Sequence, residues 1–285
     1  MTGGTRGLDL RSIQTLFDVG SLSGLTDGQL LEQFLERKDQ ESEAAFAALM
    51  ALHSSMVWNV CRGVLPDSHA AEDAFQATFL LLVRKAGSIR RREALGSWLH
   101  GVARRVAVRA KADASRRRLH EGENARLGET SMHDLSQREE FAALHEEVDR
   151  LPEKYRAAVL LCHFEGRTHS EAASLLRCPT GTVSIRLSRA RELLRDRLTR
   201  RGVSLSPAVG LALGLRSART ALPAGLAEST IKAATRYIAA GKAMVTGVVP
   251  AAVAQLTEGV LRTMTVKKLA IAATTLLVTG LAASE

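Results

Sequence analysis

Apolar side chains in this chain recur at intervals of three and four residues, and that spacing limits the fold more than any other feature. Val183, Leu187, Ala190 and Leu194, for example, stand at relative positions 0, 4, 7 and 11, which is one face of an α-helix. The alternation of Val, Ile, Thr and aromatic residues that a β-sandwich needs is missing. Ala and Leu, which favour helices, dominate instead. The sequence therefore predicts an all-α fold.

Helix-capping residues, breaks and glycines divide the 285 residues into two small helical domains and flanking segments. In the first domain, helices are expected at about 26–37, 42–64, 68–85 and 97–118, with a basic loop at 86–96. The predicted organisation is a disordered N-terminus at 1–25, a four-helix domain at 26–118, a flexible linker at 119–137, a second helical domain at 138–201, and an Ala/Leu-rich helical tail at 202–285.

Charge is distributed unevenly along the chain. The net charge of +9 conceals an acidic block of −6 from Asp27 to Val83, a basic block of +10 from Arg84 to Arg118, and a second basic block of +6 from Gly166 to Arg201. Two separate basic blocks predict two contacts with a polyanion.

The second basic block contains a helix-turn-helix pattern. Thr168 and Glu171 have the spacing of a capping box, the Cys178-Pro179 pair breaks the chain, and Thr180 is expected to cap the next helix. The second helix of such a motif enters the DNA major groove with its N-terminal end. Its outward face supplies the predicted DNA-binding residues Thr182, Ser184, Ile185, Arg186, Ser188 and Arg189.

Two groups of residues resemble one protein family. The runs 151–156 (LPEKYR), 178–183 (CPTGTV) and 186–191 (RLSRAR) resemble the promoter −35-binding domain of extracytoplasmic-function (ECF) sigma factors, of the sigma-70 family. The run 73–79 (DAFQATF) resembles the segment that binds RNA polymerase, and 98–105 (WLHGVARR) the segment that opens the −10 element. The match extends over residues 20–201; Ile185 departs from the polar or basic residue that the family more often has there.

The resemblance implies a sigma factor that binds RNA polymerase core enzyme and promoter DNA, with an anti-sigma factor as a further candidate partner. Phe79 and Trp98 each have an alternative interpretation as core residues. The implied polymerase-binding residues are Asp73, Gln76 and Phe79, and the implied −10-binding residues are Arg91, Arg92, Trp98, Arg104, Arg105 and Lys111.

Catalysis is not expected, because the sequence has no paired carboxylates, phosphate-binding glycine loop or nucleophile triad. Three cysteines without a C-x-x-C pair, and histidines without ligand spacing, predict neither a disulfide framework nor a metal or other cofactor. A cytoplasmic location fits this composition.

The end of the tail has two interpretations. Residues 269–283 carry no charge and follow Lys267 and Lys268, but 15 helical residues span about 22 Å, which is short of the roughly 30 Å hydrocarbon core. The segment is either an anchor to the inner face of the cytoplasmic membrane or a helix that packs on the protein. Helices near 211–215 and 231–243 are candidates for regulation by covering a DNA-binding surface.

Two other functions compete with the sigma factor. A helix-turn-helix regulator would bind DNA without polymerase and would not need the face formed by Asp73, Gln76 and Phe79. A membrane-associated interaction protein would use the basic blocks on anionic lipid.

Overall fold

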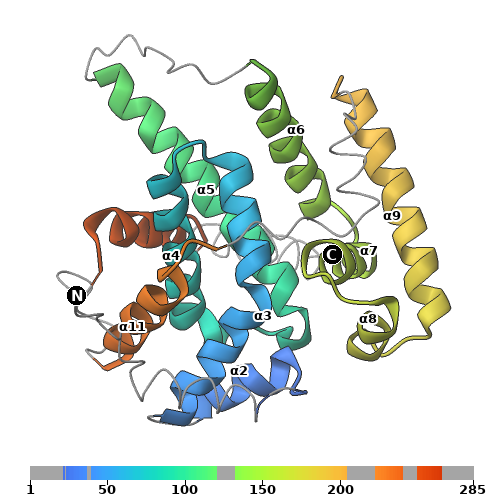
Figure 1. Cartoon of the computed structure of the whole chain (residues 1–285), viewed down its shortest axis with the longest axis horizontal. Coiled ribbons are helices and arrows are strands. Elements are labelled where there is room, and N and C mark those ends of the chain that lie inside the picture. The colour runs from blue at the N-terminus through green and yellow to red at the C-terminus, as the bar shows by residue number, and fades with distance from the viewer. Residues whose placement is uncertain are drawn as a thin grey trace, which may run out of the picture.

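The computed structural model describes residues 22, 24–36, 40–120, 132–203, 222–239 and 249–264. They form two helical modules side by side, with two C-terminal helices on the far side of the first module (Figure 1). The predicted all-α fold with a helical tail is confirmed. The N-terminal residues 1–21, the segment 204–221 and the apolar segment 269–283 lie outside the described residues, and so do the predictions made for them.

The first module is a bundle around α3. Apolar side chains from all its helices meet in one core, where the rings of Phe75 and Phe79 lie 5.0 Å apart. Asp67 caps the third helix by accepting a hydrogen bond from the backbone N–H of Ala70 at 2.8 Å, and this helix begins at Ser68 as predicted. Its helices are α2 (Asp27–Glu36), α3 (Gln40–Val64), α4 (Ser68–Lys85) and α5 (Leu95–His120), with short 3-10 turns at Ala86–Ser88 and Arg92–Ala94.

Helix α3 is, among the described residues, the one helix long and apolar enough to cross a membrane. Most of it is buried against α2, α4 and α5, so it is the central core helix of the first module.

The second module consists of α6 (Met132–Asp149), α7 (Glu153–Val159), a π-helical turn (Leu160–Phe164), α8 (His169–Leu175) and α9 (Thr180–Arg200). Helix α6 begins inside the range predicted as linker. The capping box of α8 is confirmed: the Thr168 side chain accepts from the backbone N–H of Glu171, and the Glu171 carboxylate accepts from that of Thr168. Helix α9 starts at Thr180 itself, so Pro179 and not Thr180 occupies the N-cap position.

A buried histidine joins the two modules. His53 of α3 is 1 % exposed; its Nε2 lies 3.1 Å from Oδ1 of Asp27, and its Nδ1 lies 3.1 Å from Oε1 of Glu165 in the second module. Burial lowers the pKa of His53, but the two carboxylates outweigh burial and raise that pKa to about 10. The modules therefore meet through a buried charged group as well as through the covalent connection.

A second polar cluster joins α5 to α6. Asp149 at the end of α6 accepts a hydrogen bond from Nε of Arg104 at 2.6 Å and lies 2.7 Å from Nδ1 of His100. Burial raises the pKa of Asp149, but the hydrogen bonds and charges of His100 and Arg104 outweigh it and lower that pKa to about 2. Nε2 of His100 lies 3.1 Å from Nδ1 of His145, whose pKa burial lowers to about 3, so His145 is neutral.

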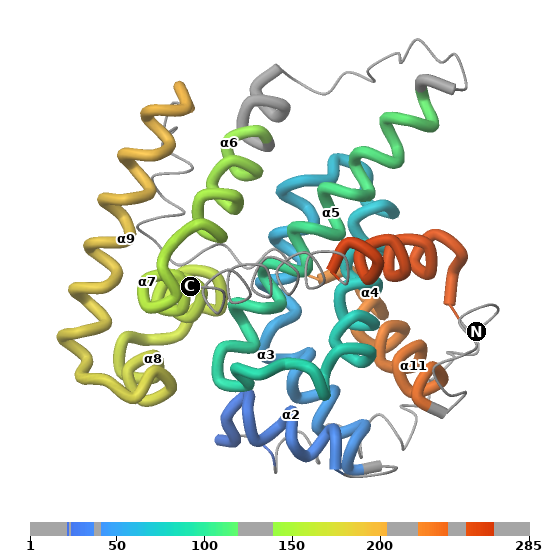
Figure 2. The backbone as a smooth tube through the Cα atoms, turned by 180° about the vertical axis from the view of Figure 1, so that it is seen from behind, coloured from blue at the N-terminus to red at the C-terminus, as the bar shows by residue number. Residues whose placement is uncertain are grey.

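The two C-terminal helices pack on the first module. Helix α11 (Leu226–Ala239) contacts α3 and α4, and a further helix covers residues 251–264. Figure 2 shows this last helix crossing close to α4 and α5. Apolar residues of both helices, among them Leu226, Tyr237 and Val253, belong to the same buried cluster as Phe75 and Phe79. Residues 222–239 and 249–264 are thus part of the folded first module.

Candidate functional site

Helix α9 presents the predicted DNA-binding face to solvent. Its apolar stripe is buried against α7 and α8, and this fixes the orientation of the opposite side. Ser184, Ile185, Ser188 and Arg189 are exposed, whereas Thr182 and Arg186 are half-buried. Ile185 is 71 % exposed, so it is accessible to a thymine methyl group; single exposed apolar side chains are also normal on protein surfaces. The structure therefore brings all six predicted −35 residues to one helical face.

The two arginines of this face are held loosely. Arg189 forms an exposed ion pair with Glu192 one turn further along, at 2.7 Å. Arg186 donates a long hydrogen bond of 3.7 Å to Sγ of Cys178 in the turn between the helices. Exposed ion pairs contribute little free energy, so the Arg189 guanidinium can exchange Glu192 for a phosphate or a guanine edge.

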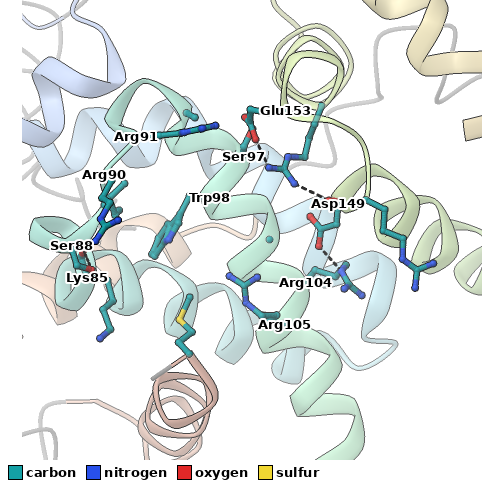
Figure 3. Close-up of a pocket in the computed structure, with 16 residues that line it drawn as sticks. Lys85, Ser88, Arg90, Arg91, Ser97, Trp98, Arg104, Arg105, Asp149 and Glu153 are labelled. Carbon is teal, nitrogen blue, oxygen red and sulfur yellow. Dashed lines mark hydrogen bonds and ion pairs between the residues drawn. The ribbon is translucent and has the colours of Figure 1, made fainter. Parts of the chain in front are cut away.

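Four of the six predicted −10 residues line one large cavity. Arg91, Trp98, Arg104 and Arg105 border a cavity of about 1080 Å³ between α5, the loop before it, and the junction of α6 and α7. Figure 3 shows Trp98 between Arg90 and the Arg104–Asp149 pair. Trp98 is half-buried, packs on the core of the first module and also borders the cavity. Its contact with −10 DNA stays a prediction.

The other two predicted −10 residues lie apart from the cavity. Arg92 donates to Oε1 of Glu32 at 3.1 Å on the surface near α2. Lys111 is exposed further along α5. Neither residue lines this cavity.

Several cavity residues were missed from the sequence. Lys85 and Arg90 belong to the basic block but were not singled out, and Arg150 and Arg156 come from the second module. Asp149 and Glu153 bring two carboxylates to the same wall (Figure 3). The basic block in the sequence could have indicated Lys85 and Arg90. No local sequence pattern relates them to Asp149, Arg150, Glu153 and Arg156, about fifty positions away, so only the packing of the modules identifies these four.

Phe79 was predicted to bind polymerase, but the structure places it in the core. Its side chain is completely buried and packs edge-on against Phe46 at a centroid distance of 6.3 Å. Most side chains of α4 are buried, and Phe79 is one of them. It therefore belongs to the core of the first module. Asp73 and Gln76 lie on its half-buried side, and burial raises the pKa of the Asp73 carboxyl.

Two sequence-family models match the two modules. The model described as Sigma-70 region 2 matches residues 49–117, and the one described as Sigma-70, region 4 matches residues 141–194. Each match falls on the module for which the resemblance was stated. The fold and the two basic surfaces thus define a two-module, helical DNA-binding protein of the sigma-70 type.

Individual proteins similar to this chain indicate which group of sigma-70 factors it resembles. The chain is 28 % identical over 175 residues to the RNA polymerase sigma-H factor of Pseudomonas aeruginosa, covering 57 % of this chain and 91 % of that protein. It is 27 % identical over 188 residues to the ECF RNA polymerase sigma-E factor of Haemophilus influenzae (60 % and 96 %), and 28 % over 184 residues to that of Escherichia coli K12 (60 % and 95 %). The chain belongs to the ECF sigma factors of the sigma-70 family. Residues 222–264 lie beyond both family-model matches.

Proposed function

We propose that this sigma factor directs RNA polymerase to promoters by contacting DNA at two places, with α9 on the −35 element and the α5 cavity on the −10 element. The observation that carries the proposal is the pair of cationic surfaces on two different modules, each matched by its own family model. The protein is proposed to act by binding and not by catalysis. It is proposed to act in the cytoplasm, where the chromosome and polymerase are.

The −35 contact follows from the geometry of α9. Its first turn exposes backbone N–H groups and Thr182 toward a phosphate, because Pro179 leaves that end without a side-chain cap. Ser184, Ile185, Ser188 and Arg189 then face the base edges, with Arg186 on the flank. The buried stripe on the opposite side holds this face in place.

The −10 contact uses the cavity beside Trp98. Single-stranded DNA needs cationic side chains for its backbone and an aromatic or apolar wall for an unstacked base. Arg91, Arg104 and Arg105 supply the charge and Trp98 the wall. Asp149 already accepts a hydrogen bond from Nε of Arg104, so DNA that uses this nitrogen must displace the Asp149 carboxylate.

Core polymerase is proposed to dock on α4 through Asp73 and Gln76. These two polar side chains lie on the same half-buried face of α4, within the acidic part of the chain. Phe79 is no longer part of this surface. An anti-sigma factor would be a natural competitor for the same face, and membrane tethering through residues 269–283 stays a prediction from the sequence.

Genomic run-off transcription tests the function. Purified core enzyme transcribes fragmented genomic DNA with and without the full chain, and the 5′ ends of the transcripts are sequenced. We expect new start sites that share two upstream motifs, and we expect Arg186→Ala with Arg189→Ala to abolish the sites that depend on the −35 motif. Arg200→Ala, at the exposed far end of α9, is the matched control and should leave them unchanged.

The polymerase-independent regulator predicts a different result. Such a protein would bind duplex DNA containing the −35 motif but would produce no new start sites with core enzyme. That result would refute the proposed function.

A further inference from the structure

The face of α4 that bears the proposed polymerase-binding residues is occupied by the C-terminal helices of the same chain. Gln76 donates a hydrogen bond through Nε2 to Oγ of Ser229 in α11, at 3.2 Å. Asp73 borders a cavity of about 270 Å³ whose other walls include Ala252, Gln255 and Leu256 of helix 251–264. Both residues proposed to bind polymerase therefore face the C-terminal segment.

An ion pair holds the second of these helices against α4. Arg84, near the end of α4, pairs with Glu258 of helix 251–264. The Arg84 and Glu258 side chains are 22 % and 43 % exposed, so solvent screens this pair in part. The contact lies about two turns beyond Gln76 and about three turns beyond Asp73 along α4, and it involves neither of them.

Apolar side chains also hold α11 and helix 251–264 against the first module. Leu226 and Tyr237 of α11, and Val253, Leu256 and Val260 of the next helix, are almost completely buried in the core cluster of the first module. Burial of apolar surface is the main favourable contribution to such packing. A partner that uses this face of α4 must first displace side chains that are already buried there.

The same helix reaches the basic side of α5. Gly259 lies so close to Arg109 that a β-carbon at this position would collide with its guanidinium. Val260 and Thr263 border a cavity together with Arg104 and Arg105, and Met264 lies at the wall of the large cavity beside Trp98. One helix thus contacts both the α4 face and the surface proposed for −10 DNA.

We propose that α11 and helix 251–264 form an intramolecular cover that competes with core RNA polymerase for α4. In this state the chain is closed, and polymerase binding requires α11 and helix 251–264 to leave the α4 face. The inference rests on the proposed function, since it takes the α4 face to be the polymerase-binding surface. It goes beyond that function by assigning the C-terminal segment a role as a built-in competitor.

A charge reversal at the edge of the cover tests this. Glu258→Arg in the full chain places a guanidinium against Arg84 and weakens the cover without altering Asp73, Gln76 or the apolar core. Glu228→Arg is the matched control, because Glu228 pairs within α11 with Lys232 and does not contact α4 through that pair. We expect Glu258→Arg to bind purified core polymerase about five- to tenfold more tightly than the wild type, and Glu228→Arg to stay within about twofold.

Hydrogen exchange gives a second measurement on the unmodified chain. If the cover leaves α4, amides in 226–239 and 251–264 should exchange faster when core polymerase binds. Unchanged exchange in both helices, or equal affinity of the wild type and Glu258→Arg, overturns the cover while leaving the sigma function intact. If neither protein binds core polymerase at all, the proposed function itself fails, and the cover fails with it.

Discussion

His53 is the single side chain whose replacement should most change how the two modules hold together. It is buried and carries a positive charge between Asp27 of the first module and Glu165 of the second, because its pKa is raised to about 10. Replacing it in His53→Gln keeps a hydrogen-bonding side chain but removes the charge, which leaves the buried Glu165 carboxylate without a cation. Breaking a buried ion pair in this way costs about 3–5 kcal/mol of unfolding free energy.

The loss should depend on pH in a defined direction. Because the folded pKa lies above the unfolded value of 6.5, the stabilisation is complete below pH 6.5 and declines as the pH rises toward about 10. Each pH unit within that window removes up to about 1.4 kcal/mol. The difference in unfolding free energy between the wild type and His53→Gln should therefore shrink by about 3 kcal/mol between pH 6.5 and pH 9.

Urea denaturation of both proteins at pH 6.5, 7.5 and 9 measures this difference. A difference that is the same at all three pH values would refute the reasoning, since it would mean that His53 is not charged in the folded protein. Small-angle scattering at pH 7 is a second readout, because loss of the bridge between the modules should increase the radius of gyration.

Three further changes have defined outcomes. Thr168→Ala removes the capping box of α8 and should cost about 1 kcal/mol in thermal denaturation, with reduced helix-turn-helix affinity for −35 duplex only near the melting temperature. Asp149→Asn weakens the contacts to His100 and Arg104 and should cost about 2–3 kcal/mol at pH 7; because the Asp149 pKa is lowered to about 2, the cost should diminish as the pH falls below about 4. Phe79→Ala should lower the unfolding free energy by about 3–5 kcal/mol in urea, as expected for a core aromatic, and an unchanged midpoint would contradict its placement in the core.

Local patterns predicted the elements of this fold well. The Asp67 side chain and the Thr168–Glu171 pair each satisfy backbone N–H groups of the helix that follows, so their effect can be predicted from a few adjacent positions. The −35 face was predictable for the same reason: the buried stripe of α9 fixes which residues point outward.

Long-range packing set the limits of prediction. Phe79 was misassigned because α4 is apolar on more than one side, and periodicity cannot tell a core position from an interface position in such a helix. The charge of His53 was not predicted, because its partners Asp27 and Glu165 are 26 and 112 positions away. The cover was anticipated only as a general candidate for regulation over a DNA surface, since no local signal relates Ser229 to Gln76 across 153 positions.

Direct association with core RNA polymerase tests the central claim most simply. Sedimentation velocity of purified core enzyme mixed with the full chain, or with its Glu258→Arg variant, reports whether the two travel as one species. We expect comigration at micromolar concentration, with a larger bound fraction for the variant. Failure of both proteins to comigrate with core enzyme would contradict the account.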